Sequence, residues 1–182
     1  MGLKEVGMRE SANALLCLTV AVAALAVPAI AQPAAPTAAQ QGFDKLKTLQ
    51  GEWIDVDGVF GVKGAVAVAY EVTSGGNVVM ETFPVNTPGA MVTVYHLDGQ
   101  DLLLTHFCSS PNQPRMRSNG LDGNTLAFDF DGGTNIDPAT TSNMHAATIQ
   151  FVSSDEVIAT WQNWRDGKPA GSGASFRIAR KQ

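Results

Sequence analysis

The sequence predicts an all-β fold, an antiparallel up-and-down β-barrel of about nine to ten strands with a short N-terminal helix. Short runs rich in valine, threonine and aromatic residues follow Trp53 at close spacing, which is typical of β-strands. Turn signals such as Asp-Gly separate these runs, and helical periodicity is almost absent among them. Consecutive hairpins favour an antiparallel meander, and closing the meander into a barrel removes the exposed edges of the sheet.

The elements follow in order along the chain. A short helix is expected first, because Phe43, Leu46 and Leu49 recur at helical spacing. The first strand is expected at Trp53. The later strands are expected at residues 62–72, 77–83, 90–97, 101–109, 114–118, 125–132, 145–153, 156–164 and 173–181. Only the connection at 132–144 is long, and loops of that length are commonly functional or mobile.

Residues 1–31 have the pattern of a secretory signal peptide. An apolar core at residues 14–27 precedes Ala29 and Ala31, which form a small-x-small cleavage signal. The core is shorter than the roughly 20 apolar residues that span a bilayer, so no membrane span is expected in the mature form. An uncleaved anchor is the alternative. The pattern predicts a periplasmic or secreted protein.

The rest of the chain divides into two parts. Residues 32–40 are rich in proline and alanine and are expected to be a flexible linker. Residues 41–182 form the predicted barrel domain, which is long enough to bury a core without further constraints.

Charge and cysteine content exclude some classes of function. The net charge is −5, and cleavage leaves it unchanged because the signal peptide carries two basic and two acidic residues. A mildly acidic protein with scattered basic residues has no electrostatic reason to bind nucleic acid or anionic lipid. Only Cys108 remains after cleavage, so no intramolecular disulfide can form.

The stretch from Met91 to Ser110 reads as a hairpin around Asp98-Gly99 or Gly99-Gln100. Both two-residue turns leave the same residues on each face, whereas a three-residue loop would swap one strand relative to the other. One face is expected to hold Met91, Thr93, Tyr95, Leu97, Leu102, Leu104, His106 and Cys108. The other is expected to hold Val92, Val94, His96, Leu103, Thr105 and Phe107.

His106 and Cys108 are two residues apart on one strand, so their side chains are predicted neighbours. Their face mixes apolar bulk with a few polar groups, which suits a ligand pocket inside a small barrel. The alternatives are a packed core with satisfied polar residues, and a catalytic or metal site. The sequence argues against a metal because only His96 and His145 could add ligands of that kind and no zinc motif is present.

A second candidate region is the run "SSPNQPRMR" that follows the hairpin. Asn112 and Gln113 can cap its turn or bond a ligand at the barrel mouth. Arg115 and Arg117 share one face of the next strand, where inward side chains could hold a carboxylate. At least one is expected to face outward, since charge is rarely buried unpaired.

The opening Gly51-Glu52-Trp53 is similar to the Gly-x-Trp opening of lipocalins and other calycin barrels. In those barrels the tryptophan packs beneath a basic side chain from the final strand. Here Arg177 and Arg180 could supply that side chain. The resemblance implies a lipocalin-like barrel in which Trp53 has a structural role.

A more specific resemblance extends over nearly all of residues 43–181. The runs "FDKLKTLQGEW", "MVTVYHLDG", "LLLTHFCSSPNQPRM" and "TNIDPATTSNMH" resemble the DUF1579-type family of small exported bacterial β-barrels, whose function is undetermined. The resemblance implies export and a barrel, but no activity. It directs attention to His106, Cys108, Asn112, Gln113, Arg115, Asn135 and His145. Haem barrels of the nitrobindin type bind haem through a histidine near the C-terminus, and no histidine follows His145, which argues against haem.

The leading hypothesis is an exported protein that binds a small apolar or amphipathic molecule in its barrel. The first alternative is an enzyme that uses His106 as a general base, assisted by Cys108 or a metal. The second is a protein-interaction module. The sequence favours a binder over an enzyme, predicts no cofactor, and does not predict the oligomeric state. The candidate ligand-binding residues are Thr93, Tyr95, Leu104, His106, Cys108, Asn112, Gln113, Arg115, Asn135 and His145.

Overall fold

The computed structural model describes residues 1–2, 34–61 and 63–182. The predicted signal peptide and its cleavage site lie outside the described residues, apart from the first two. Within the described part of the chain, no helix has the length and apolar character needed to cross a membrane.

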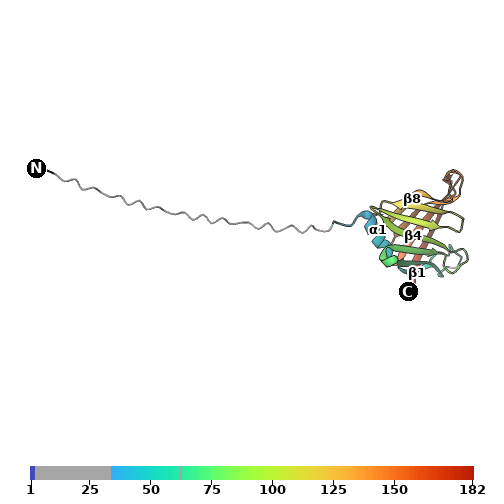
Figure 1. Cartoon of the computed structure of the whole chain (residues 1–182). Coiled ribbons are helices and arrows are strands. Elements are labelled where there is room, and N and C mark those ends of the chain that lie inside the picture. Colours follow the sequence, from blue (N-terminus) through green and yellow to red (C-terminus); the bar gives the residue numbers. More distant parts are fainter. Residues whose placement is uncertain (3–33, 62) are drawn as a thin grey trace. The chain divides into compact units, whose positions relative to one another are not determined.

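The chain folds into one short helix and a series of antiparallel strands (Figure 1). Helix α1 spans Ala38–Lys47 and therefore begins inside the range predicted to be a linker. Its N-cap is Thr37, whose side chain accepts a hydrogen bond from the Gln40 backbone N–H. The strands are β1 (Gly51–Asp55), β2 (Val66–Thr73), β3 (Val78–Phe83), β4 (Met91–Asp98), β5 (Asp101–Phe107), β6 (Gln113–Ser118), β7 (Leu121–Asp122), β8 (Thr125–Thr134), β9 (Asn143–Phe151), β10 (Glu156–Arg165), β11 (Lys168–Pro169) and β12 (Ala174–Arg180). A single turn of 3-10 helix, Ser74–Gly76, joins β2 to β3.

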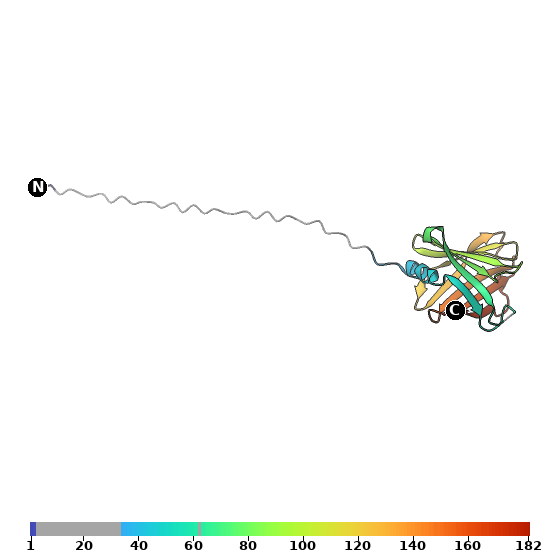
Figure 2. The ribbon, with the colours of Figure 1, turned by 90° about the horizontal axis from the view of Figure 1, so that it is seen from below.

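Ten of these strands close into a barrel, as the sequence predicted. From β1 to β6 each strand pairs with the next, then β6 pairs with β8, β8 with β9 and β9 with β10. Strand β12 completes the ring by pairing with both β10 and β1. The two-residue strands β7 and β11 pair with β8 and β10 outside this ring. Figure 2 shows the closed sheet from a second side.

Helix α1 covers one end of the barrel (Figures 1 and 2). Phe43 and Leu46 on the helix, with Leu49 just after it, are buried in the barrel core. Gly42 lets the helix approach closely, because a Cβ at this position would lie 2.7 Å from Leu126 Cδ2. The apolar residues whose spacing predicted the helix thus form the face that seals the barrel.

Trp53 and Arg180 close the same end. Trp53 is fully buried, and its indole N–H donates to the Leu49 carbonyl at 2.7 Å. The Arg180 guanidinium lies 4.5 Å from the centre of the Trp53 ring, a cation–π contact. Arg177, the other candidate for this role, instead pairs with Asp57 at 3.1 Å.

The β4–β5 hairpin turns at Gly99-Gln100, the second of the two predicted turns. Leu97 pairs with Leu102, and Thr93 pairs with His106. Gly99 has φ +61°, a left-handed conformation that glycine adopts without strain. The face that carries Thr93 and His106 is buried in the barrel interior.

Candidate functional site

The barrel interior contains a small cavity of about 30 Å³. Five strands of the ring supply its walls: β3, β4, β5, β9 and β10. Its lining residues are Glu81, Phe83, Met91, Thr93, His106, Met144 and Trp161. A cavity of this size holds about one water molecule. Because Phe83, Met91 and Met144 are only half-buried, we infer that the cavity opens outward between them.

Glu81 is the acidic group of the cavity. It is 3% exposed, and the Tyr95 hydroxyl donates to its Oε2 at 2.5 Å. Burial raises the pKa of Glu81 to about 7, although the hydrogen bond from Tyr95 opposes this rise. Among the described residues, no lysine or arginine forms an ion pair with Glu81. The barrel therefore holds a carboxyl group without a counter-ion.

Two tyrosines flank Glu81 on the neighbouring strands. Tyr70 on β2 is paired with Glu81 in register, and Tyr95 lies on β4. Burial raises the pKa of both phenols well above the ordinary value, and the nearby Glu81 charge adds to the effect. Both tyrosines are therefore neutral at physiological pH.

His106 is the second titratable group that lines the cavity. Its Nδ1 lies 3.0 Å from Thr93 Oγ1, and its ring lies 4.9 Å from the Trp161 ring at an angle of 42°. The other ring nitrogen, Nε2, is buried and has no hydrogen-bond partner among the described residues. Burial lowers the pKa of His106 to about 4, so the imidazole is neutral at pH 7. A buried nitrogen without a partner is costly unless something else bonds to it.

Glu81 and His106 contribute oppositely to the pH dependence of stability. The pKa of Glu81 rises from 4.5 to about 7 on folding, so in this range the folded protein binds more protons and stability falls as pH rises. The pKa of His106 falls from 6.5 to about 4, so the unfolded chain binds more protons and stability falls as pH drops. Between about pH 4.5 and 6.5 the two slopes largely cancel.

Single substitutions should reveal how each of the two groups changes the stability of the protein with pH. Relative to wild type, Glu81→Gln should gain about 3 kcal/mol of stability as pH rises from 4.5 to 7. His106→Gln should gain about 3 kcal/mol relative to wild type as pH falls from 6.5 to 4. Urea denaturation at half-unit pH steps measures both differences. A Glu81→Gln curve that runs parallel to wild type would contradict the burial of an unpaired carboxyl group.

Three predicted site residues of the hairpin do not line the cavity. Tyr95 is connected to it through the hydrogen bond to Glu81. Leu104 is fully buried in the core beside Tyr95 in register. Cys108 is half-buried and follows the end of β5, and it does not line the cavity that contains His106. The structure therefore shows no contact that would let His106 act on the Cys108 thiol.

Asn112 and Asn135 hold loops near the end of the barrel. Asn112 is 3% exposed, and its Nδ2 donates to the Ser142 carbonyl at 2.9 Å. Asn135 Nδ2 donates to the Pro111 carbonyl at 3.3 Å. Gln113 is half-buried at the start of β6. These contacts connect the segment after β5 to the long loop before β9.

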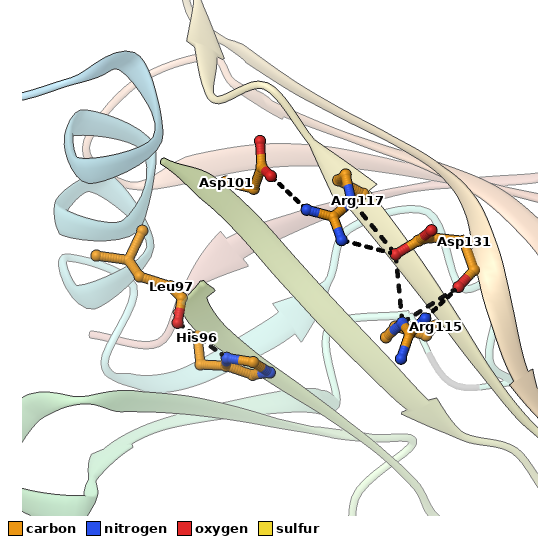
Figure 3. A network of polar contacts seen from close by, with 6 residues as sticks. All are labelled: His96, Leu97, Asp101, Arg115, Arg117 and Asp131. Atoms are coloured by element: carbon orange, nitrogen blue, oxygen red, sulfur yellow. Dashed lines mark hydrogen bonds and ion pairs between the residues drawn. The ribbon is translucent and has the colours of Figure 1, made fainter. Parts of the chain in front are cut away.

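Arg115 lies outside the barrel. It donates from Nε and Nη2 to the Asp131 backbone carbonyl at 3.1 and 2.8 Å. Arg117 pairs with the Asp131 carboxylate and with Asp101. Figure 3 shows both arginines directed toward Asp131, with His96 bonded to the Leu97 carbonyl nearby. Neither arginine lines the interior cavity.

His145 forms part of an aromatic stack. Its ring lies 4.3 Å from that of Phe130 and 3.9 Å from that of Trp164, nearly parallel to both. Its Nδ1 lies 3.2 Å from Asn143 Oδ1. This packing gives His145 a structural role in joining β8, β9 and β10. No group of three or more potential metal-binding side chains occurs in the described parts of the chain.

The predicted site residues do not include Glu81, Phe83, Met144 or Trp161, and Met91 was placed only on the correct face of the hairpin. A signal for Glu81 was present, because it is in phase with Val79 and Phe83 along one strand. An acidic residue at such a position is either exposed, or buried with a partner or in its neutral form. The partners on β9 and β10 had no comparable signal, because only barrel closure brings them opposite β3.

Comparison with known proteins assigns the chain to no family. No protein-family model matches the chain, and no curated protein matches it.

Proposed function

We propose that this protein is an exported binder of a small amphipathic molecule, held head-first in the barrel cavity. Export is proposed from the apolar N-terminal segment and the Ala29-x-Ala31 signal. The observation that supports binding is His106, which lines the cavity and whose buried Nε2 has no hydrogen-bond partner among the described residues. A ligand head group would supply the missing hydrogen bond.

The size of the cavity limits how a ligand can bind. Drug-sized ligands occupy pockets of about 300–1,000 Å³. The present cavity, about 30 Å³, admits only a head group. The remainder of the ligand would lie at the opening, against Phe83, Met91 and Met144. Methionine side chains are flexible and adapt to different apolar shapes, so the two methionines favour an apolar tail.

An enzyme is the second candidate, and one observation favours it. Glu81 and His106 share a cavity, and their pKa values are shifted in opposite directions. Such pairs can divide the roles of general acid and general base. The cavity, however, has room for about one small group, so binding of a head group is the simpler use of the same residues.

An interaction module has weaker support. Among the described residues of the barrel domain, the exposed large hydrophobic side chains are Val59, Phe107 and Val152. Only these three are exposed among the described residues of the domain, whereas docking surfaces are apolar patches of several hundred Å².

The test is His106→Gln, assayed with hexan-1-ol and hexylamine as probes. Glutamine keeps a hydrogen-bonding group but changes its position, so binding should weaken by about 1 kcal/mol, or roughly fivefold. His96→Gln is the matched control, because His96 is half-buried on the other face of the hairpin. Calorimetric titration measures affinity, and thermal melts confirm that both variants fold. Equal affinities of wild type and His106→Gln would remove His106 from the site.

A further inference from the structure

We infer that the head group bound in the cavity is an ammonium group, so that the ligand is an amphipathic amine. The ammonium nitrogen would donate to the Glu81 carboxylate and to His106 Nε2. This inference rests on the proposed binding function and specifies its ligand. It follows from the hydrogen-bonding capacity, charge and size of the cavity.

The free polar atoms of the cavity are acceptors. Tyr95 occupies Oε2 of Glu81, and no hydrogen bond from a described residue reaches Oε1. We assign to His106 the tautomer that an ammonium ligand requires, with the proton on Nδ1, which then donates to Thr93 Oγ1 at 3.0 Å. In this tautomer Nε2 is an acceptor, and it has no donor among the described residues. An ammonium group has three N–H donors and no acceptor, which matches this set.

The charge of the groups that line the cavity also favours an ammonium head group. The polar groups that face Glu81 are Tyr70 from β2, Thr93 and Tyr95 from β4, and His106 from β5. All four are neutral at pH 7, and among the described residues no lysine or arginine lines the cavity. A buried carboxylate is costly without a cation, and an ammonium ligand would supply that cation. A carboxylate ligand would instead place two negative charges together.

The size of the cavity and its aromatic lining also suit an ammonium group. A cavity needs about 10–15 Å³ to hold one water molecule, so a cavity of about 30 Å³ has room for an ammonium group, which is similar in size to water. Trp161 forms part of the wall, and tryptophan is the side chain whose ring face attracts cations best. The alkyl part of the amine would extend past Phe83 and the two methionines.

Binding of an ammonium group should be coupled to the proton on Glu81. Because burial raises the pKa of Glu81 to about 7, most Glu81 is protonated at pH 5 and most is ionised at pH 8. Each pH unit below 7 should reduce affinity for an amine about tenfold. The pKa of His106 is lowered to about 4, and those of Tyr70 and Tyr95 are raised, so these groups do not titrate in this range.

The experiment compares hexylamine, hexan-1-ol and hexanoate, which share a six-carbon chain, by calorimetric titration into the purified exported protein at pH 8 and pH 5. Hexylamine should bind at least about tenfold more tightly than hexan-1-ol at pH 8, and hexanoate should bind most weakly. The affinity for hexylamine should fall by roughly 100-fold at pH 5, while that for hexan-1-ol stays constant.

Glu81→Gln provides the second arm. It should reduce hexylamine affinity to about that of hexan-1-ol at both pH values, so that the roughly 100-fold pH dependence of hexylamine binding disappears. Glu71→Gln is the matched control, because Glu71 is exposed on the adjacent strand β2 and should have no effect. If Glu81→Gln does not fold, the pH profile of wild type with the two probes decides the question.

The outcomes separate the two proposals. Equal binding of hexylamine and hexan-1-ol at pH 8, or full hexylamine affinity in folded Glu81→Gln, would overturn the ammonium inference while the binding function stands. Failure of all three probes to bind wild type would overturn the proposed binding function and the ammonium inference together.

Discussion

Replacement of Trp53 by alanine is expected to lower the free energy of unfolding by about 3–5 kcal/mol, the usual cost of emptying a large aromatic site. Trp53 is fully buried, and its ring packs edge-on against Tyr70 with centres 6.3 Å apart. The alanine variant would also leave the Leu49 carbonyl without its indole donor.

The loss of stability in Trp53→Ala should also affect β12, the final strand. Arg180 lies over the Trp53 ring and donates to the Gln50 and Thr48 carbonyls at 3.0 and 2.8 Å. Without the ring beneath it, the guanidinium loses its packing surface, and the contacts between β12 and the segment before β1 weaken. The space left by the missing Trp53 ring would therefore lie where β12 pairs with β1 and closes the barrel.

Denaturant melts of the variant measure this effect, with Trp164→Ala as the control. Trp164 is half-buried and stacks on His145, so its loss should cost less, about 1–2 kcal/mol. A loss below about 1 kcal/mol for Trp53→Ala would show that the ring does not support the barrel end.

The architecture could be predicted because its signals are local. Alternation along each strand and turn residues between strands predicted an antiparallel barrel, and the structure has one. The short helix was predicted from Phe43, Leu46 and Leu49, all of which are buried. The hairpin faces were predictable because both two-residue turns give the same alternation, and Thr93 does lie opposite His106.

The candidate site was harder to predict because its residues come from strands far apart in the sequence. Glu81 on β3 and Trp161 on β10 are far apart in the sequence but line the same cavity. Alternation along a strand does not reveal which inward residues lie at the same height in the barrel. Cys108 shows a second limit, because β5 ends at Phe107 and the alternation does not continue to the next residue. Arg180 rather than Arg177 covers Trp53, since Trp53 and Arg180 are register partners.

Gly120→Ala should also have a large effect, a loss of about 4 kcal/mol of stability. Gly120 has φ +108°, a conformation that residues with a side chain rarely adopt, and this strain costs about 1–3 kcal/mol. A Cβ there would also lie well inside van der Waals contact with the backbone of Ala38 and Ala39. Overpacking adds about 1–3 kcal/mol, because neither backbone segment can move independently.

Gly61→Ala isolates the contribution of the helix. Gly61 has nearly the same φ as Gly120, +112°, but a Cβ there would meet no atom of the described residues within 4 Å. Its replacement should cost only the conformational strain, about 1–3 kcal/mol. The excess loss in Gly120→Ala, measured by urea denaturation, then reports how firmly the start of α1 is held against the connection between β6 and β7. Equal losses in the two variants would mean that α1 moves aside at little cost, and that the barrel end is sealed mainly by Trp53 and Arg180.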